Sequence, residues 1–157
     1  MKIECWNIGK TADRYLDEGI QKYAGKLPHY LPFEWVILPD IRQAGKLKPE
    51  QLKQKEADLV LSRLKPQDGL IILDENGKQF TSEGLATWVD QQLQRPYRRL
   101  IFLVGGAFGF DESIYKRANG KLSLSKMTFS HQMVRLFWLE QLYRAMTILR
   151  NEPYHNS

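Results

Sequence analysis

The chain has 157 residues with ordinary shares of hydrophobic (43%) and charged (26%) side chains, which predicts a single globular domain spanning residues 1–157. Its net charge of +5 suits a polyanionic partner such as RNA without requiring one. The only cysteine, Cys5, excludes an intrachain disulfide, and its apolar neighbours favour a buried, inert thiol.

Several classes of protein find no support in the sequence. A signal peptide, a membrane-spanning run and a lipidation motif are all missing, which predicts a cytoplasmic protein with no membrane partner. His29, His131 and His155 lie far apart, and neither HExxH nor CxxC occurs, so we expect no metal site. Serine-triad hydrolysis is unsupported because no GxSxG elbow is present.

The first half of the chain alternates strands and helices. We expect a strand over 3–8 closed by Gly9, a helix over 11–26 capped by Thr11, and a second strand over 33–38. A basic loop over 40–48 then leads to a helix over 49–64. The residues expected to face inward are Tyr15, Leu16, Ile20, Tyr23 and Leu27 in the first helix and Ala57, Val60, Leu61 and Leu64 in the second.

The second half continues the alternation. A strand over 70–73 ends in a turn at 74–77, and Ser82 can cap the next helix. A strand over 100–104, a short helix ending near 118, a strand over 122–125 and a long helix over 132–150 follow. The pattern predicts an α/β fold with a mainly parallel sheet and helices on both faces. Taken alone, it predicts an open, unknotted sheet.

Glycines follow the buried strand LIFLV, in the segment GGAFGF over 105–110. Glycine has no Cβ, so such a turn can bring backbone amides against a nucleotide-like ligand. The segment fits neither the G-x-G-x-x-G fingerprint nor a P-loop. Ligands of parallel sheets bind beyond the carboxyl ends of the strands, so the loops at 73–77, 105–109 and 126–130 are the candidate site.

Polar side chains gather in the last part of the chain. His131 directly follows the third loop, and Arg135 lies four residues later on the same helical face. Either residue could instead be structural, with Arg135 as a surface partner of Glu140. Tyr154 and His155 lie in the tail, where one offers a ring for stacking and the other titrates near neutral pH. A frayed chain end is the alternative reading of this tail.

Taken together, these segments resemble the RlmH family, small SPOUT-class methyltransferases that modify pseudouridine in 23S ribosomal RNA. The resemblance spans the chain through MKIECWNIGK, LIILDENGKQFTSEGLA, LVGGAFGF, LSLSKMTFSHQMVRLFWLEQLYRA and the terminal PYH. One departure is Ser130, where the family often has proline before the histidine. The resemblance implies a SPOUT (α/β-knot) fold with a C-terminal trefoil knot, whose loops form the cofactor pocket.

The resemblance also implies the chemistry. S-adenosylmethionine would be the methyl donor, with no metal, and N3 of a pseudouridine in 23S ribosomal RNA would be the acceptor. Because no RNA-binding domain is appended, the assembled ribosome is the expected substrate. The expected cofactor contacts are Leu73, Gly105, Gly106, Leu124, Ser125, Lys126, Met127, Thr128 and Phe129. The expected catalytic, substrate-side residues are His131, Arg135, Tyr154 and His155.

Three questions stay open at this point. The imide nitrogen must lose its proton before it can attack the methyl group, and the sequence does not identify the base. The substrate could be another RNA, or the protein could be a non-catalytic ribosome-binding relative. The resemblance implies a homodimer, and the last helix is apolar over an arc wide enough to need partners on two sides.

Overall fold

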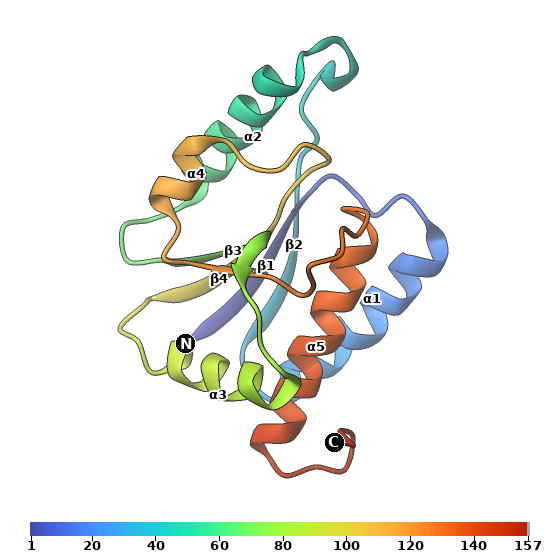
Figure 1. Ribbon diagram of the computed structural model, residues 1–157, viewed down its shortest axis with the longest axis vertical. Helices are drawn as coiled ribbons and strands as arrows, with labels where there is room; N and C mark the ends of the chain where they lie inside the picture. The colour runs from blue at the N-terminus through green and yellow to red at the C-terminus, as the bar shows by residue number, and fades with distance from the viewer. Residues whose placement is uncertain (157) are drawn as a thin grey trace.

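A five-stranded parallel sheet forms the centre of the computed structural model, which describes residues 1–156 (Figure 1). The strand order is β2-β1-β4-β3-β5, and each of the four pairings is parallel. The strands are β1 (Lys2–Ile8), β2 (Phe33–Leu38), β3 (Gly69–Lys78), β4 (Arg99–Val104) and β5 (Gly120–Leu122). The predicted parallel α/β architecture is therefore confirmed.

Helices cover both faces of this sheet (Figure 1). One face packs against α1 (Arg14–Lys26), α3 (Ser82–Leu93) and α5 (Met133–Leu149), and the other against α2 (Pro49–Arg63) and α4 (Glu112–Arg117). Short 3-10 turns lie at Leu27–His29 and Ala44–Lys46. Successive strand residues point to opposite faces, so the apolar run of β4 feeds both cores: Phe102 belongs to one, while Ile101 and Leu103 belong to the other.

The last helix, α5, is enclosed largely within its own chain. It contacts α1 on one side and α3 on the other. Its Trp138 packs on Phe102, with ring centroids 4.6 Å apart, and donates its indole N–H to Sγ of Cys5 at 3.3 Å. Cys5 is fully buried, as predicted, and burial raises the pKa of its thiol to about 12. The wide apolar arc of α5 thus finds most of its partners inside one chain, and the homodimer stays a prediction.

Three details of the helices differ from the sequence expectation. The first helix begins at Arg14 rather than at Thr11, whose hydroxyl instead accepts a hydrogen bond from Arg135 at 3.1 Å. The cap of α3 is Thr81 rather than Ser82, because the Thr81 hydroxyl accepts from the Gly84 amide at 3.0 Å. Tyr15 is 65% exposed, so it does not belong to the inward stripe of α1.

Two predictions around β3 and β5 are wrong. The segment expected as a turn at 74–77 lies inside β3, which runs on to Lys78 and pairs there with Leu122 after an irregularity in the register. A Cβ at Gly77 would lie 2.7 Å from backbone atoms of Leu122, so this close approach requires glycine. The last strand ends at Leu122 instead of Ser125, because the Ser123 hydroxyl bonds the Ser125 carbonyl at 2.9 Å and the chain turns.

Two broader observations complete the fold. Within residues 1–156, no helix is both long and apolar enough to span a membrane, and no cluster of three His, Cys, Asp or Glu side chains could hold a metal ion. The trefoil knot is a matter of how α5 threads past the preceding loops. The strand pairings do not test it, and it stays a prediction of the resemblance.

Candidate functional site

The three candidate loops meet around one cavity of about 700 Å³ at the carboxyl edge of the sheet. Its walls come from the end of β3, the glycine turn after β4, and the irregular segment between β5 and α5. Eight of the nine expected cofactor residues line it: Leu73, Gly105, Gly106, Leu124, Ser125, Met127, Thr128 and Phe129. Lys126 is the one that does not line the cavity.

The glycines of the turn serve packing more than ligand approach. A Cβ at Gly105 would lie 2.9 Å from the ring of Phe110, and one at Gly106 would lie 2.8 Å from the Glu56 carboxylate. Gly109 has a φ of +81°, which favours glycine. The turn is therefore held tightly against α2 and the Phe110 ring, and its peptide groups keep a fixed place in the cavity wall.

Acidic side chains add charge that the sequence analysis did not assign to the site. Asp74 and Glu75 line the cavity, and Oδ2 of Asp74 is buried without a hydrogen-bond partner among the described residues. Glu75 accepts a hydrogen bond from the Thr128 hydroxyl at 3.1 Å. Burial and the neighbouring Asp74 carboxylate raise the pKa of Tyr115, another wall residue, to about 12. These two carboxylates outnumber the one lysine of the lining, Lys53, so the cavity wall carries net negative charge and suits a ligand with positive charge. Both acids directly follow the buried strand LIIL, a signal that could have placed them.

Serine side chains shape the irregular wall and the start of α5. The Ser125 hydroxyl accepts from the Met127 amide at 2.9 Å, and the Ser130 hydroxyl accepts from the Met133 amide at 3.0 Å. Ser130, which stands where the resembled family often has proline, thus satisfies one of the unpaired amides at the first turn of α5. At position 130, this chain therefore has a side-chain hydrogen bond to the first turn of α5, where the resembled family often has the rigid ring of proline.

His131 is brought to this cavity by that first turn of α5. Partial burial and the positive charge of Arg135 both lower the pKa of its imidazole below the ordinary value of 6.5. The ring is therefore neutral at pH 7, with a nitrogen free to accept a proton.

Arg135 lies behind the cavity rather than in it. Its side chain is 2% exposed, and its guanidinium donates to the carbonyl oxygens of Ile8 at 2.8 Å and Gly9 at 2.9 Å. These bonds tie α5 to the loop that leaves β1. Burial lowers the pKa of Arg135, which the charge of Asp40 partly offsets. Direct contact between Arg135 and a substrate would require this anchor to open.

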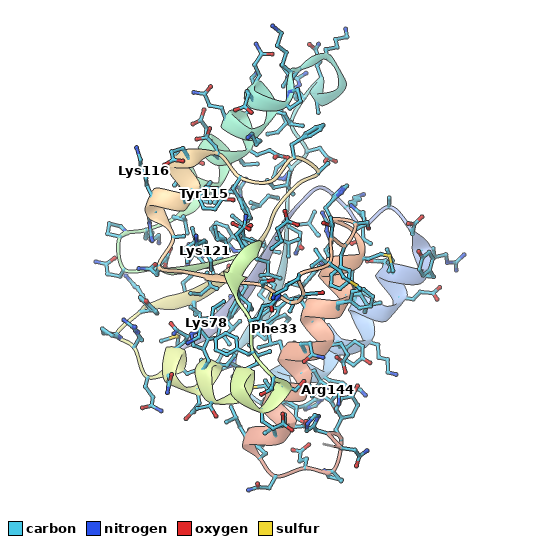
Figure 2. The ribbon with its side chains drawn as sticks, in the orientation of Figure 1. Phe33, Lys78, Tyr115, Lys116, Lys121 and Arg144 are labelled. Atoms are coloured by element: carbon cyan, nitrogen blue, oxygen red, sulfur yellow. The ribbon has the colours of Figure 1, made fainter. Side chains whose placement is uncertain are left out.

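The tail residues lie at the other end of α5. The Tyr154 hydroxyl donates to Glu140 at 3.0 Å, and the Arg144 guanidinium stacks 4.8 Å from the Tyr154 ring centroid (Figure 2 labels Arg144). His155 contacts Arg144 through Nδ1 at 3.1 Å and Glu83 through Nε2 at 2.8 Å. The tail is thus docked on α3 and α5 rather than frayed. Within one chain, the structure brings His131 to the cavity but not Arg135, Tyr154 or His155.

Comparison with known proteins identifies the class of this fold and cavity. The family described as "Predicted SPOUT methyltransferase" matches residues 1–155, so the chain belongs to the SPOUT methyltransferases. It is 52% identical to the ribosomal RNA large subunit methyltransferase H of Cytophaga hutchinsonii, over 99% of this chain and 100% of that protein. The proteins of the same name from Parabacteroides distasonis and Flavobacterium johnsoniae are 51% and 50% identical, each over 99% of both chains. Within the SPOUT class, the chain belongs to the family of these methyltransferases.

Proposed function

We propose that this protein transfers a methyl group from S-adenosylmethionine to N3 of a pseudouridine in 23S ribosomal RNA, on the assembled ribosome. The observation that carries the proposal is the cavity formed where the ends of β3, β4 and β5 meet. Its relatives are named as methyltransferases of large-subunit ribosomal RNA. Ribosomes occupy the cytoplasm, so we place the protein there.

The cavity fits this methyl donor in size and chemistry. Its volume of about 700 Å³ falls within the ordinary range of small-molecule sites. Leu73, Leu124 and Phe129 would face the apolar parts of the donor, while the peptide groups of the glycine turn would bond its polar edges. The unpaired Oδ2 of Asp74 offers a carboxylate to a ligand that carries a sulfonium and an ammonium group.

Among the residues at the edge of the cavity, His131 is best suited to accept the proton of the acceptor imide. When bound, the donor supplies a methyl group on a positively charged sulfur. The acceptor imide must give up its N–H proton as the new nitrogen–carbon bond forms. Because the pKa of His131 is lowered, its neutral ring can take that proton at pH 7. Arg135, held 2% exposed, would act by fixing the first turn of α5 on which His131 stands.

We also propose a homodimer. Apolar side chains remain exposed along α5 and the adjacent α1, among them Tyr15 at 65%, Met133 at 37% and Leu149 at 38%. A second copy placed on this face would cover them, and twofold pairing is the commonest arrangement among soluble oligomers. Light scattering at micromolar concentration tests it, and a monomer would contradict it.

Two measurements test the proposed reaction. Titration calorimetry should show binding of S-adenosylmethionine to the purified protein, and a non-catalytic ribosome-binding protein would show none. Mass spectrometry of ribosomal RNA from cells lacking the gene should then show one pseudouridine without its methyl group, restored by a plasmid copy. Normal ribosomal RNA together with a missing methyl group in another RNA would favour the alternative substrate.

A further inference from the structure

A second cavity of about 360 Å³ lies beside the first, between the start of α3 and the middle of α5. The two cavities share part of their walls, namely Leu122, Ser123, Leu124 and Phe129. Any molecule in the second cavity therefore lies directly against the segment that would hold the methyl donor. Neither the expected cofactor contacts nor the expected catalytic residues account for this space.

Aromatic rings form the apolar part of its lining. Phe80 comes from the chain before α3, Phe129 from the irregular segment and Phe137 from α5. The rings of Phe129 and Phe137 meet edge to face, with centroids 5.1 Å apart, and Phe137 is 39% exposed. A planar ring entering from solvent would find faces for stacking on these side chains.

Hydrogen-bonding groups also line the cavity. The Ser82 hydroxyl donates to Oε1 of Gln141 at 3.0 Å, and the Gln141 amide donates to Glu140 at 3.1 Å. An amide together with a hydroxyl offers both donors and acceptors to the carbonyl and N–H groups of a pyrimidine edge. Glu140 also accepts from Tyr154 at 3.0 Å, so the docked tail adjoins this cavity within the same chain.

A cation stands next to the aromatic lining. Lys78, which Figure 2 labels, is exposed, and its ammonium lies 5.1 Å from the centroid of the Phe80 ring. Positive charge next to a stacking surface suits a nucleotide, whose phosphate and base need both at once. A second copy of this chain carries a net charge of +5, so its overall charge gives it no attraction to Lys78.

We propose that the second cavity is the subsite for the acceptor nucleotide, with a uracil-type base between the aromatic rings and the Gln141 amide and its phosphate near Lys78. This inference rests on the proposed function, because the base has to reach the methyl donor where the two cavities adjoin, at the lining residues that they share. It gives Gln141, Phe137 and Lys78 roles in binding RNA. It also brings Tyr154 next to the acceptor without help from another subunit.

Kinetics on large ribosomal subunits test the proposal. Phe137→Ala and Gln141→Leu should each lower kcat/KM for methyl transfer at least about tenfold, through lost stacking or lost hydrogen bonds. Affinity for S-adenosylmethionine, measured by calorimetry, should stay within twofold. Met133→Ala is the matched control, since Met133 is similarly exposed at 37% one turn earlier on α5 and lines neither cavity.

Other outcomes overturn the assignment. Wild-type kcat/KM in both variants would exclude a base subsite. Lost S-adenosylmethionine affinity would assign the space to the cofactor. If Phe137→Ala and Met133→Ala both reduce activity and both dissociate a dimer, a second copy covers the cavity.

Should the wild-type protein fail to methylate ribosomal RNA, the proposed function fails separately. NMR then decides the subsite alone: uridine 5′-monophosphate should shift the Gln141 side-chain amide signals of the wild-type protein, and unshifted signals would refute it.

Discussion

The guanidinium of Arg135 donates a hydrogen bond to the carbonyl oxygen of Gly9 at 2.9 Å, joining α5 to the end of β1 across 126 positions of sequence. The same group bonds the Ile8 carbonyl and the Thr11 hydroxyl. One buried cation thus satisfies three acceptors where the sheet meets the helix that carries His131. Its position makes it an anchor of the site.

Removing this anchor should destabilise the protein. In Arg135→Met, buried carbonyl oxygens lose charged donors, so the free energy of unfolding should fall by roughly 2–4 kcal/mol. Urea denaturation measures it. Arg14→Met is the control. The Arg14 side chain is 94% exposed, so its replacement should change the free energy of unfolding little. Equal stability of Arg135→Met and the wild type would show that these bonds contribute nothing.

His131 should titrate below its ordinary pKa. Burial and the Arg135 charge disfavour the protonated ring, so its NMR titration midpoint should lie below 6.5. The sign for stability follows: the unfolded chain binds this proton more readily, so His131 lowers stability as pH falls through 6.5. The missing signal in His131→Gln assigns the resonance. A midpoint at or above 6.5 would contradict the environment described for the ring.

Acid should weaken the protein partly through Asp68. Burial alone would raise the pKa of this carboxyl, but the hydrogen bonds from Arg99 and from the Lys65 amide leave it below its usual value. A lowered folded-state pKa gives stability that is complete above the unfolded value and is lost as pH falls through the folded one. Urea unfolding between pH 5 and pH 2 should therefore show that the free energy of unfolding falls less steeply with pH for Asp68→Asn than for the wild type. Parallel losses would contradict this role.

Strand and helix positions were largely predictable because each depends on local pattern. The expected strand over 33–38 matches β2, and the expected parallel sheet is present. Errors arose where long-range pairing overrode local signals. The residues at 74–77 read as a turn, yet they lie within β3, where they bulge out of the ladder because Leu73 and Lys78 both pair with Leu122 of β5. Thr11 resembled a helix cap, but its hydroxyl is engaged by Arg135 from the far end of the chain.

The candidate cavity was predictable from strand ends and resemblance, and the environments of its polar residues were not. Helical spacing placed His131 and Arg135 on one face of the last helix, but spacing does not show which other segments of the chain pack against that face. Arg135 meets the carbonyls after β1 and is buried, whereas His131 stays at the rim. The second cavity was missed because Phe80, Phe129 and Phe137 are scattered in sequence and converge only in the fold.

The glycine turn should not tolerate even one added methyl group. In Gly105→Ala the new Cβ would lie 2.9 Å from the Phe110 ring, which must move, and Phe110 also lines the cofactor cavity. We expect a loss of about 1–3 kcal/mol in stability together with weaker binding of S-adenosylmethionine, by urea denaturation and calorimetry. Gly25→Ala is the control, since nothing lies within 4 Å of its added Cβ in α1. Unchanged affinity in Gly105→Ala would remove the turn from the cofactor site.

The tail should serve the RNA rather than the cofactor. Because Arg144 can only donate, Nδ1 of His155 accepts its hydrogen bond, while Nε2 of the same ring lies 2.8 Å from the Glu83 carboxylate. Tyr154 bonds Glu140 beside the second cavity. Glu140 and Arg144 pair directly with each other at 2.6 Å, so we expect that ion pair to persist when the tail is removed.

Deletion of residues 153–157 therefore removes a stacking ring and an imidazole from the acceptor side and no wall of the donor cavity. Methylation of ribosomes should fall at least about tenfold, since stacking on one aromatic is typically worth about 1–3 kcal/mol. Binding of S-adenosylmethionine should stay within a few-fold of normal. Tyr154→Phe separates the ring from its hydroxyl: it keeps the stacking surface but loses the bond to Glu140. Full activity in the truncated protein would leave the tail without a role in the reaction, and lost donor affinity would move it to the cofactor cavity.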